Sequence, residues 1–375
     1  MLVALSGAQL YGQTVMDTKP ELIPSEPHPA GWWPNDGLAP RQTYVGPEAC
    51  ASCHPAETAS WKTSQMAHAI KPAAESKFLR AHPHLSYKRG PYTYRIDTAG
   101  GHALYTVTDG QHELSIPLLW AYGTGVVGQA YVFRINGVYY EAVVAYYPVL
   151  DGLDVVAGLI RTMPPDLPRA FGLPLSSDAA QQCISCHTTA AVTGKQLRVN
   201  SMILGVTCEA CHGPGARHVA VMEARGKQSA PNATFIFSPA KLHPPDLENF
   251  CGACHRTSLR VIREGLHGLD TVHYEPYRLE MSQCWIMSQR ITCTTCHNPH
   301  QPLERHTAAY DSACLSCHLS KAGPVTASHP AKACPVAARD CASCHMPKCR
   351  LPLAPFKMSD HFIRVVGPND ACAKS

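Results

Sequence analysis

The segment Gly205-Val-Thr-Cys-Glu-Ala-Cys-His-Gly-Pro-Gly-Ala-Arg-His218 contains the pattern that decides the fold. Two cysteines are separated by two residues and followed at once by a histidine. This Cys-x-x-Cys-His pattern occurs seven times in the 375 residues and uses 14 of the 18 cysteines. The seven motifs begin at Cys50, Cys183, Cys208, Cys251, Cys293, Cys314 and Cys341.

The histidine in the fifth position of the motif shows which kind of site these cysteine pairs form. A zinc ribbon needs the cysteine pairs but not an obligatory histidine directly after each. A thioredoxin-like redox pair would occur once or twice, and a disulfide framework needs no such short pairs. Cys-x-x-Cys-His is the c-type haem attachment motif, in which two thiols bind the porphyrin edge and the histidine binds the iron. The sequence therefore predicts seven covalently attached haem c groups.

The predicted haem-binding residues follow from the motifs. The attachment cysteines are Cys50, Cys53, Cys183, Cys186, Cys208, Cys211, Cys251, Cys254, Cys293, Cys296, Cys314, Cys317, Cys341 and Cys344. The proximal iron ligands are His54, His187, His212, His255, His297, His318 and His345.

The composition agrees with an interior that is partly cofactor. Aromatic residues make up 7% of the chain and charged residues 16%, whereas charged residues in soluble domains come to about a quarter. We expect porphyrin to supply much of the apolar volume. The formal charge of +4 excludes a strongly basic nucleic-acid-binding protein. No apolar run reaches the roughly 18 residues of a membrane span, so no transmembrane segment is expected.

The composition along the chain predicts five segments. The first is a signal remnant and Pro-rich arm, expected to lie outside the core. Its start lacks a basic region, so it is either a truncated signal or a short tail. The segments are the arm at 1–45, a first haem segment at 46–84, an antiparallel β insert at 85–150, a Pro-rich connection at 151–182 and a six-haem domain at 183–375.

The β insert carries the clearest local signals. Tyr92, Tyr94 and Ile96 alternate with polar residues, and Asn136-Gly137 separates two β-rich runs, as in a two-residue hairpin. The insert either shields haem edges or docks a partner or substrate. The predicted fold is therefore a mostly α and irregular multihaem cytochrome c fold, built around stacked haems, with an inserted antiparallel β module at about 85–150.

Distal iron ligands are expected near the motifs. His218, His300 and His361 each follow a motif within a short distance and are the first candidates. A helix is predicted from Pro55 to Ile70, where His68 and Met66 point in different directions, so at most one of them can face a given haem. His273 is a further candidate. An iron bound by two histidines has no free position for a substrate and only carries electrons. A five-coordinate iron would be open to substrate.

Four cysteines lie outside the motifs: Cys284, Cys334, Cys349 and Cys372. An exported protein could pair them in three ways. We expect Cys284 to pair with Cys334.

Several extended motifs resemble the multihaem cytochromes c related to the tetrahaem electron carrier of nitrifiers, whose wider kin include hydroxylamine oxidoreductase and multihaem nitrite reductases. The resemblance rests on the segment ending at His218, on Cys293-Thr-Thr-Cys-His-Asn-Pro-His300 and on Cys341-Ala-Ser-Cys-His-Met-Pro-Lys348. It implies export, a chain of stacked haems, and distal ligation by His218, His300 and His361. The sequence departs from the enzymes of the group, since it has no Cys-x-x-Cys-Lys motif and seven rather than eight haem motifs.

These observations favour electron transfer through seven haems in the cell envelope or outside the cell. The alternative is a reductase or oxidase of a small nitrogen or sulfur compound that uses one open iron. A third hypothesis is that the protein is a structural subunit of a complex or filament. The expected partners are other cytochromes or a membrane-bound complex, with self-assembly as a further option, and the expected location is periplasmic or extracellular.

Overall fold

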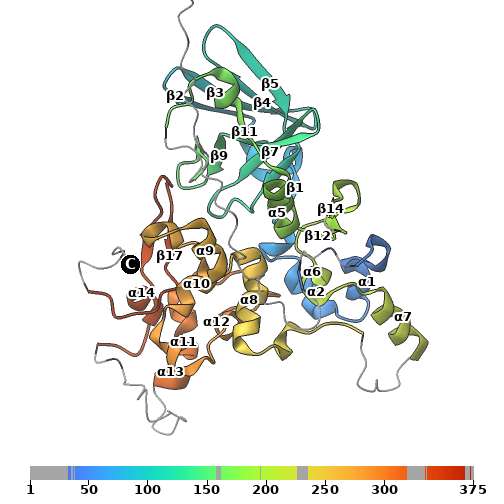
Figure 1. Cartoon of the computed structure of the whole chain (residues 1–375), viewed down its shortest axis with the longest axis vertical. Helices are drawn as coiled ribbons and strands as arrows, with labels where there is room; N and C mark the ends of the chain where they lie inside the picture. The colour runs from blue at the N-terminus through green and yellow to red at the C-terminus, as the bar shows by residue number, and fades with distance from the viewer. Residues whose placement is uncertain are drawn as a thin grey trace, which may run out of the picture.

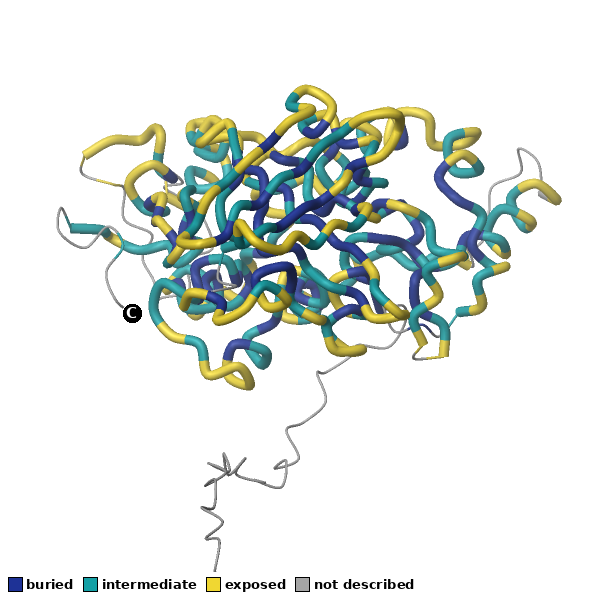
Figure 2. The backbone as a smooth tube through the Cα atoms, turned by 90° about the horizontal axis from the view of Figure 1, so that it is seen from above, coloured by how far each residue is buried: buried dark blue, intermediate teal, exposed yellow. Residues whose placement is uncertain are grey.

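The computed structural model describes residues 33–34, 37, 39–157, 162–194, 196–225, 235–318, 334, 336–367 and 372. A β-rich part lies at one end of the molecule and the helices that carry most of the haem motifs lie at the other (Figure 1). Seen from above, buried residues lie in the interior and exposed residues on the peripheral loops (Figure 2). Most of the predicted arm at 1–45 lies outside the described residues.

The β-rich part contains two main antiparallel sheets. The first is a four-strand meander of β2 (His84–Arg89), β3 (Tyr92–Ala99), β4 (His102–Thr108) and β5 (Glu113–Pro117). The second has the order β1-β6-β7-β8-β11, with bounds Ile70–Pro72, Trp120–Tyr122, Ala130–Ile135, Val138–Ala142 and Gly172–Pro174. A smaller pair joins β9 (Val144–Tyr147) to β10 (Gly152–Val155). The strands thus extend beyond 85–150 on both sides.

These sheets enclose a protein core of their own. Tyr94 and Ile96 on β3 are fully buried, as their alternation predicts. Tyr105 on β4 pairs with Ile96, and its ring lies 5.9 Å from that of Phe133 on β7 of the second sheet. Since strands make up a large part of the described chain, "mostly α" is not a supported description of the fold. The antiparallel β module was predicted, but its weight in the fold was underestimated.

The predicted hairpin is present. Ile135 on β7 pairs with Val138 on β8, and Asn136 and Gly137 between them have φ angles of 48° and 88°. Two successive positive φ angles match the twist of the flanking strands, and Asn-Gly adopts them most readily.

Short helices hold the haem motifs. They are α1 (Pro47–Ala51), α5 (Ser177–His187), α6 (Cys208–His212), α8 (Pro244–His255), α12 (Cys293–Cys296), α13 (Asp311–His318) and α14 (Cys341–His345). Between them lie α7 (Ala216–Arg225), α9 (Ser258–Glu264), α10 (Glu275–Glu280) and α11 (Gln283–Ser288).

Two local expectations are wrong. The helix that begins at Pro55, α2 (Pro55–Trp61), ends at Trp61, and Met66–His68 form a separate 3-10 turn. Trp61 Nε1 donates to Val206 O at 2.9 Å, which ties the end of α2 to the chain ahead of the third motif. The arm also enters a core: Trp33 is buried, and its ring lies 5.7 Å from that of Phe250 on α8.

We predict that Gly137→Ala lowers the free energy of unfolding by about 1 kcal/mol, because a Cβ is disfavoured at positive φ. The control is Gly152→Ala. Gly152 is not at a positive φ, and a Cβ there would meet only an ordinary contact at 3.7 Å. The control should be neutral or stabilising by up to about 1 kcal/mol. Denaturant unfolding followed by circular dichroism measures both. Equal effects would contradict the assigned turn.

Candidate haem-binding site

The seven motifs open onto one large cavity. Its volume is about 3450 Å³, and residues from all seven motifs line it. Ordinary ligand pockets occupy about 300–1,000 Å³. A cavity several times larger, lined by repeated attachment motifs, fits a set of large cofactors rather than one substrate.

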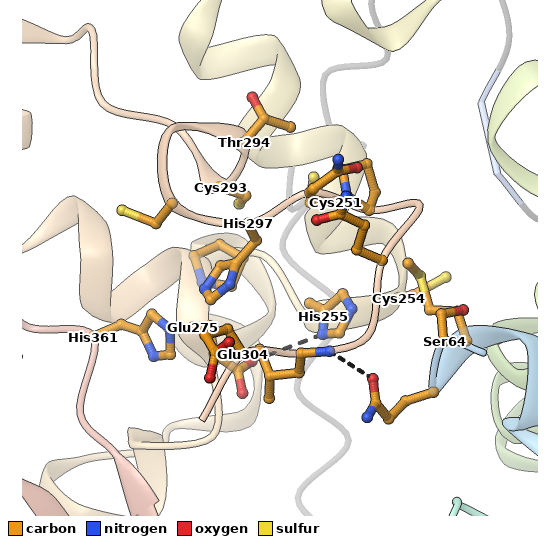
Figure 3. A pocket seen from close by; sticks show the side chains of 18 of the residues that line it. Ser64, Cys251, Cys254, His255, Glu275, Cys293, Thr294, His297, Glu304 and His361 are labelled. Carbon is orange, nitrogen blue, oxygen red and sulfur yellow. Dashed lines mark hydrogen bonds and ion pairs between the residues drawn. The ribbon is translucent and has the colours of Figure 1, made fainter. Parts of the chain in front are cut away.

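Within the cavity, three motif histidines face the three histidines first proposed as distal ligands. In each pair the imidazole rings are about 6 Å apart. The pairs are His54 with His218 at 6.5 Å and 25°, His212 with His300 at 6.0 Å and 8°, and His297 with His361 at 6.2 Å and 50°. Figure 3 shows His297 and His361 side by side, with His255 nearby.

This spacing leaves room for a shared metal ion between the two rings of a pair. A metal–nitrogen bond of about 2 Å on each side, added to the distance from each bonded nitrogen to its ring centre, accounts for the separation. The donor set therefore fits haem iron with two axial imidazoles. Each of the three candidates follows one motif in the sequence but faces the histidine of another.

Hydrogen bonds to backbone carbonyls orient three of the motif histidines. Since a carbonyl can only accept, the Nδ1 atom of each ring must carry the proton, which leaves Nε2 free to bind a metal. The Nδ1 atoms of His187, His212 and His345 lie 2.9, 2.9 and 2.8 Å from the carbonyl oxygens of Ala69, Phe237 and Arg364.

Burial keeps several of these imidazoles neutral, the form that binds iron. It lowers the pKa of His361 to about 4 and that of His273 to about 4. Burial also lowers the pKa of four others: His187, His255, His297 and His300.

The remaining distal candidates are placed differently from one another. His68 is exposed and lies outside the cavity lining, whereas Met66 lines the cavity. His273 also lines it, and its Nδ1 is buried without a hydrogen-bond partner among the described residues. Its ring lies 4.5 Å from that of Tyr274, and none of the imidazoles in the described ranges faces it.

A buried ion pair fixes the segment that carries His361. The carboxylate of Asp360 accepts from Arg278 Nε at 2.8 Å and Nη2 at 2.6 Å, and from Arg364 Nη1 at 2.8 Å. Asp360 is 0% exposed and Arg278 1%. Ser282 Oγ donates to the His361 carbonyl and accepts from Ile363 N. No local sequence signal indicated this cluster, because its members are about 80 residues apart.

The structure contradicts the expected disulfide. Cys349 on β16 (Lys348–Arg350) is bonded to Cys372, with Cα atoms 5.4 Å apart. Cys284 and Cys334 are free thiols. Cys284 instead lines the cavity, where burial raises the pKa of its thiol.

Comparison with known proteins gives three matches. The family described as cytochrome c554 and c-prime matches residues 49–93 and 171–213, which contain the first three motifs. The multihaem cytochrome MtrA of Shewanella baltica (strain OS185) is 24% identical over 195 residues, covering 40% of this chain. The chain spans 55% of that relative's length. The crystal structure of the outer cell wall cytochrome OcwA matches with 16% identity and a TM-score of 0.47, covering 88% of this chain and 82% of that one.

The motifs, the facing imidazoles and the sequence matches support one class of protein. That class is the multihaem c-type cytochromes, which carry covalently bound haem c, and the chain is similar to it in its motifs and in these partial matches.

We predict that Asp360→Ala destabilises the protein by about 3–5 kcal/mol, because Arg278 would keep a buried charge without its main partner. Denaturant unfolding of the haem-loaded protein measures this change. The matched control is Glu113→Ala, which removes a carboxylate from the exposed pair with Arg95 and should cost no more than about 1 kcal/mol. A loss below 1 kcal/mol in Asp360→Ala would contradict the assigned role.

Proposed function

We propose that the chain binds seven haem c groups and passes electrons between them. The observation that carries this proposal is that all seven motifs line one continuous cavity, so groups attached to them lie close together. Close packing of redox groups favours electron hopping, and the protein tunes each group through its ligands, burial and hydrogen bonds.

Contacts between motifs suggest the route. In four pairs of motifs that are neighbours in space, a cysteine thiol of one motif lies within hydrogen-bonding reach of a cysteine thiol of the other. The pairs are Cys50 with Cys208, Cys186 with Cys254, Cys251 with Cys293, and Cys314 with Cys341. Cys211 is close enough to Cys251, and Cys296 to Cys314, to affect the pKa of one thiol in each pair. The proposed route links motifs 1, 3, 4, 5, 6 and 7 in that order, with motif 2 joining at motif 4.

The ligand assignment follows from the facing rings. Each iron is held by its motif histidine, and we assign His218, His300 and His361 as the distal ligands of the first, third and fifth haems. Two imidazoles on an iron close it to substrate, which suits electron carriage. Haem supplies one-electron redox chemistry, while the chain supplies the ligands and the spacing.

We propose export to an oxidising compartment, either periplasmic or extracellular. The Cys349–Cys372 disulfide supports this location, since such bonds persist outside the reducing cytosol. No helix within the described ranges is long and apolar enough to cross a membrane. The similarity to a multihaem cytochrome suggests other cytochromes or a membrane-bound complex as redox partners.

The haem number is the direct test. The protein should carry seven haems, because each of the seven motifs contributes to the cavity lining either both of its cysteines or one cysteine and its histidine. Intact mass spectrometry and the absorbance of the pyridine complex should both give seven, and Cys50→Ala with Cys53→Ala should give six. A lower number in the unaltered protein would contradict the proposal.

We predict that His300→Ala converts one haem from low spin to high spin, because the iron bound by His212 would lose its second imidazole. Electron paramagnetic resonance of the oxidised protein detects the new signal. His306→Ala is the matched control, since the His306 side chain is 92% exposed and pairs with Glu304 on the surface. An unchanged low-spin spectrum in His300→Ala would refute the assignment.

A further inference from the structure

Glu209 joins the third motif to the first. It lies between Cys208 and Cys211, and it is 1% exposed. Its Oε1 accepts from Val45 N at 2.9 Å and from Gly215 N at 2.7 Å, and its Oε2 accepts from Gly46 N at 2.8 Å. Gly46 is the residue just ahead of α1, which begins the first motif. One carboxylate therefore fixes the start of one haem-binding helix against another.

Glu248 makes the same kind of connection between the fourth and fifth motifs. It lies on α8, three residues before Cys251, and is 0% exposed. Its Oε1 accepts from Cys293 N at 2.9 Å, at the first residue of α12. Its Oε2 lies 3.1 Å from Cys293 Sγ. A thioether has no S–H to donate, so the backbone bond is the one that persists when haem is attached.

Asp311 repeats the arrangement between the sixth and seventh motifs. It lies three residues before Cys314 on α13. Its Oδ1 accepts from Cys341 N at 2.8 Å and its Oδ2 from Asp340 N at 2.6 Å. These are the amides at the start of α14.

The three connections share two features. In each, an acid on one motif helix binds backbone amides where another motif helix begins, and the first cysteines of the same two motifs lie within hydrogen-bonding reach. The receiving helices have four or five residues, and their first amides have no partners within so short a helix. The helix α12 also has a capping box of its own, formed by Thr292 and Thr295, but Cys293 N is bound by Glu248.

We propose that Glu209, Glu248 and Asp311, the bridging carboxylates, are positioning residues that set the geometry of three haem pairs. The pairs are 1 with 3, 4 with 5, and 6 with 7. Charge-assisted hydrogen bonds to backbone amides are short and directional, so they fix the distance and tilt between two attachment helices. This inference rests on the proposed function, because it concerns the spacing of haems that carry electrons.

The test compares amide variants of the haem-loaded protein. Glu209→Gln should have the largest effect. Glu209 accepts from three backbone amides through its two oxygens, whereas glutamine has a single side-chain oxygen. Asp311→Asn should have an intermediate effect, and Glu248→Gln the smallest, because its carbonyl can still accept from Cys293 N. Intact mass gives the haem number. Electron paramagnetic resonance then reports the magnetic coupling within haem pairs, and flash photoreduction reports the rate of electron equilibration.

The matched control is Glu264→Gln. Glu264 accepts from Arg260 and from Tyr274 Oη at 2.6 and 2.7 Å, and it binds no motif backbone. We expect seven haems in every variant, with loss of pair coupling and slower equilibration in Glu209→Gln and Asp311→Asn but not in Glu264→Gln.

Two results overturn the inference. One is an unchanged coupling spectrum and rate in both Glu209→Gln and Asp311→Asn. The other is a lower midpoint of thermal unfolding with unchanged coupling, which is what a role limited to stability predicts. The proposed function fails separately, if the unaltered protein itself shows no electron equilibration between haems. Since Asp311 is only half-buried, Asp311→Asn keeps the test valid if the buried Glu209→Gln variant does not fold.

Discussion

The structure depends on a single geometric requirement, that imidazoles from distant segments of the chain face each other about 6 Å apart. His212 and His300 meet it most closely, with rings 6.0 Å apart and 8° from parallel. Burial lowers the pKa of His300, and the Nδ1 atom of His212 donates to the Phe237 carbonyl, which leaves its Nε2 free to bind a metal. The two rings of each pair come from segments far apart in the chain. The surrounding chain must therefore hold each ring by its backbone, which explains the buried ion pair around Asp360, directly beside His361.

The β-rich part meets a different requirement. It has a core of tyrosine, phenylalanine and aliphatic side chains, so it gains stability from its own packing rather than from porphyrin. It nevertheless contacts the haem site through the second motif, since the Tyr122 ring packs edge-on against His187 at 5.1 Å. Ala69, just ahead of β1, accepts from the same histidine. The module therefore supports one motif histidine from two sides.

Sequence reasoning succeeded where the signal is local. The Asn136-Gly137 hairpin and the alternation through Tyr94 and Ile96 both depend on residues a few positions apart. It failed for long-range features. The Cys349–Cys372 bond, the burial of Trp33 against α8 and the end of α2 at Trp61 each depend on a partner far along the chain. Closeness to a motif could nominate His218, His300 and His361, but it could not indicate which motif histidine each one faces.

The pairing of the histidines has a consequence for assembly. His218 follows the third motif and faces the first, His300 follows the fifth and faces the third, and His361 follows the seventh and faces the fifth. Each of these sites is therefore completed by a segment that also carries the next odd-numbered motif. Under the proposed ligand assignment, a haem attached to the first motif gains its second imidazole only when the third motif is in place, and the same dependence links the third motif to the fifth and the fifth to the seventh. Ligand binding stabilises only the folded arrangement, so the sites should form cooperatively rather than one at a time. The bridging carboxylates add contacts between motifs 4 and 5 and between motifs 6 and 7. Within the described chain, neither of these two pairs of motifs is linked by facing imidazoles.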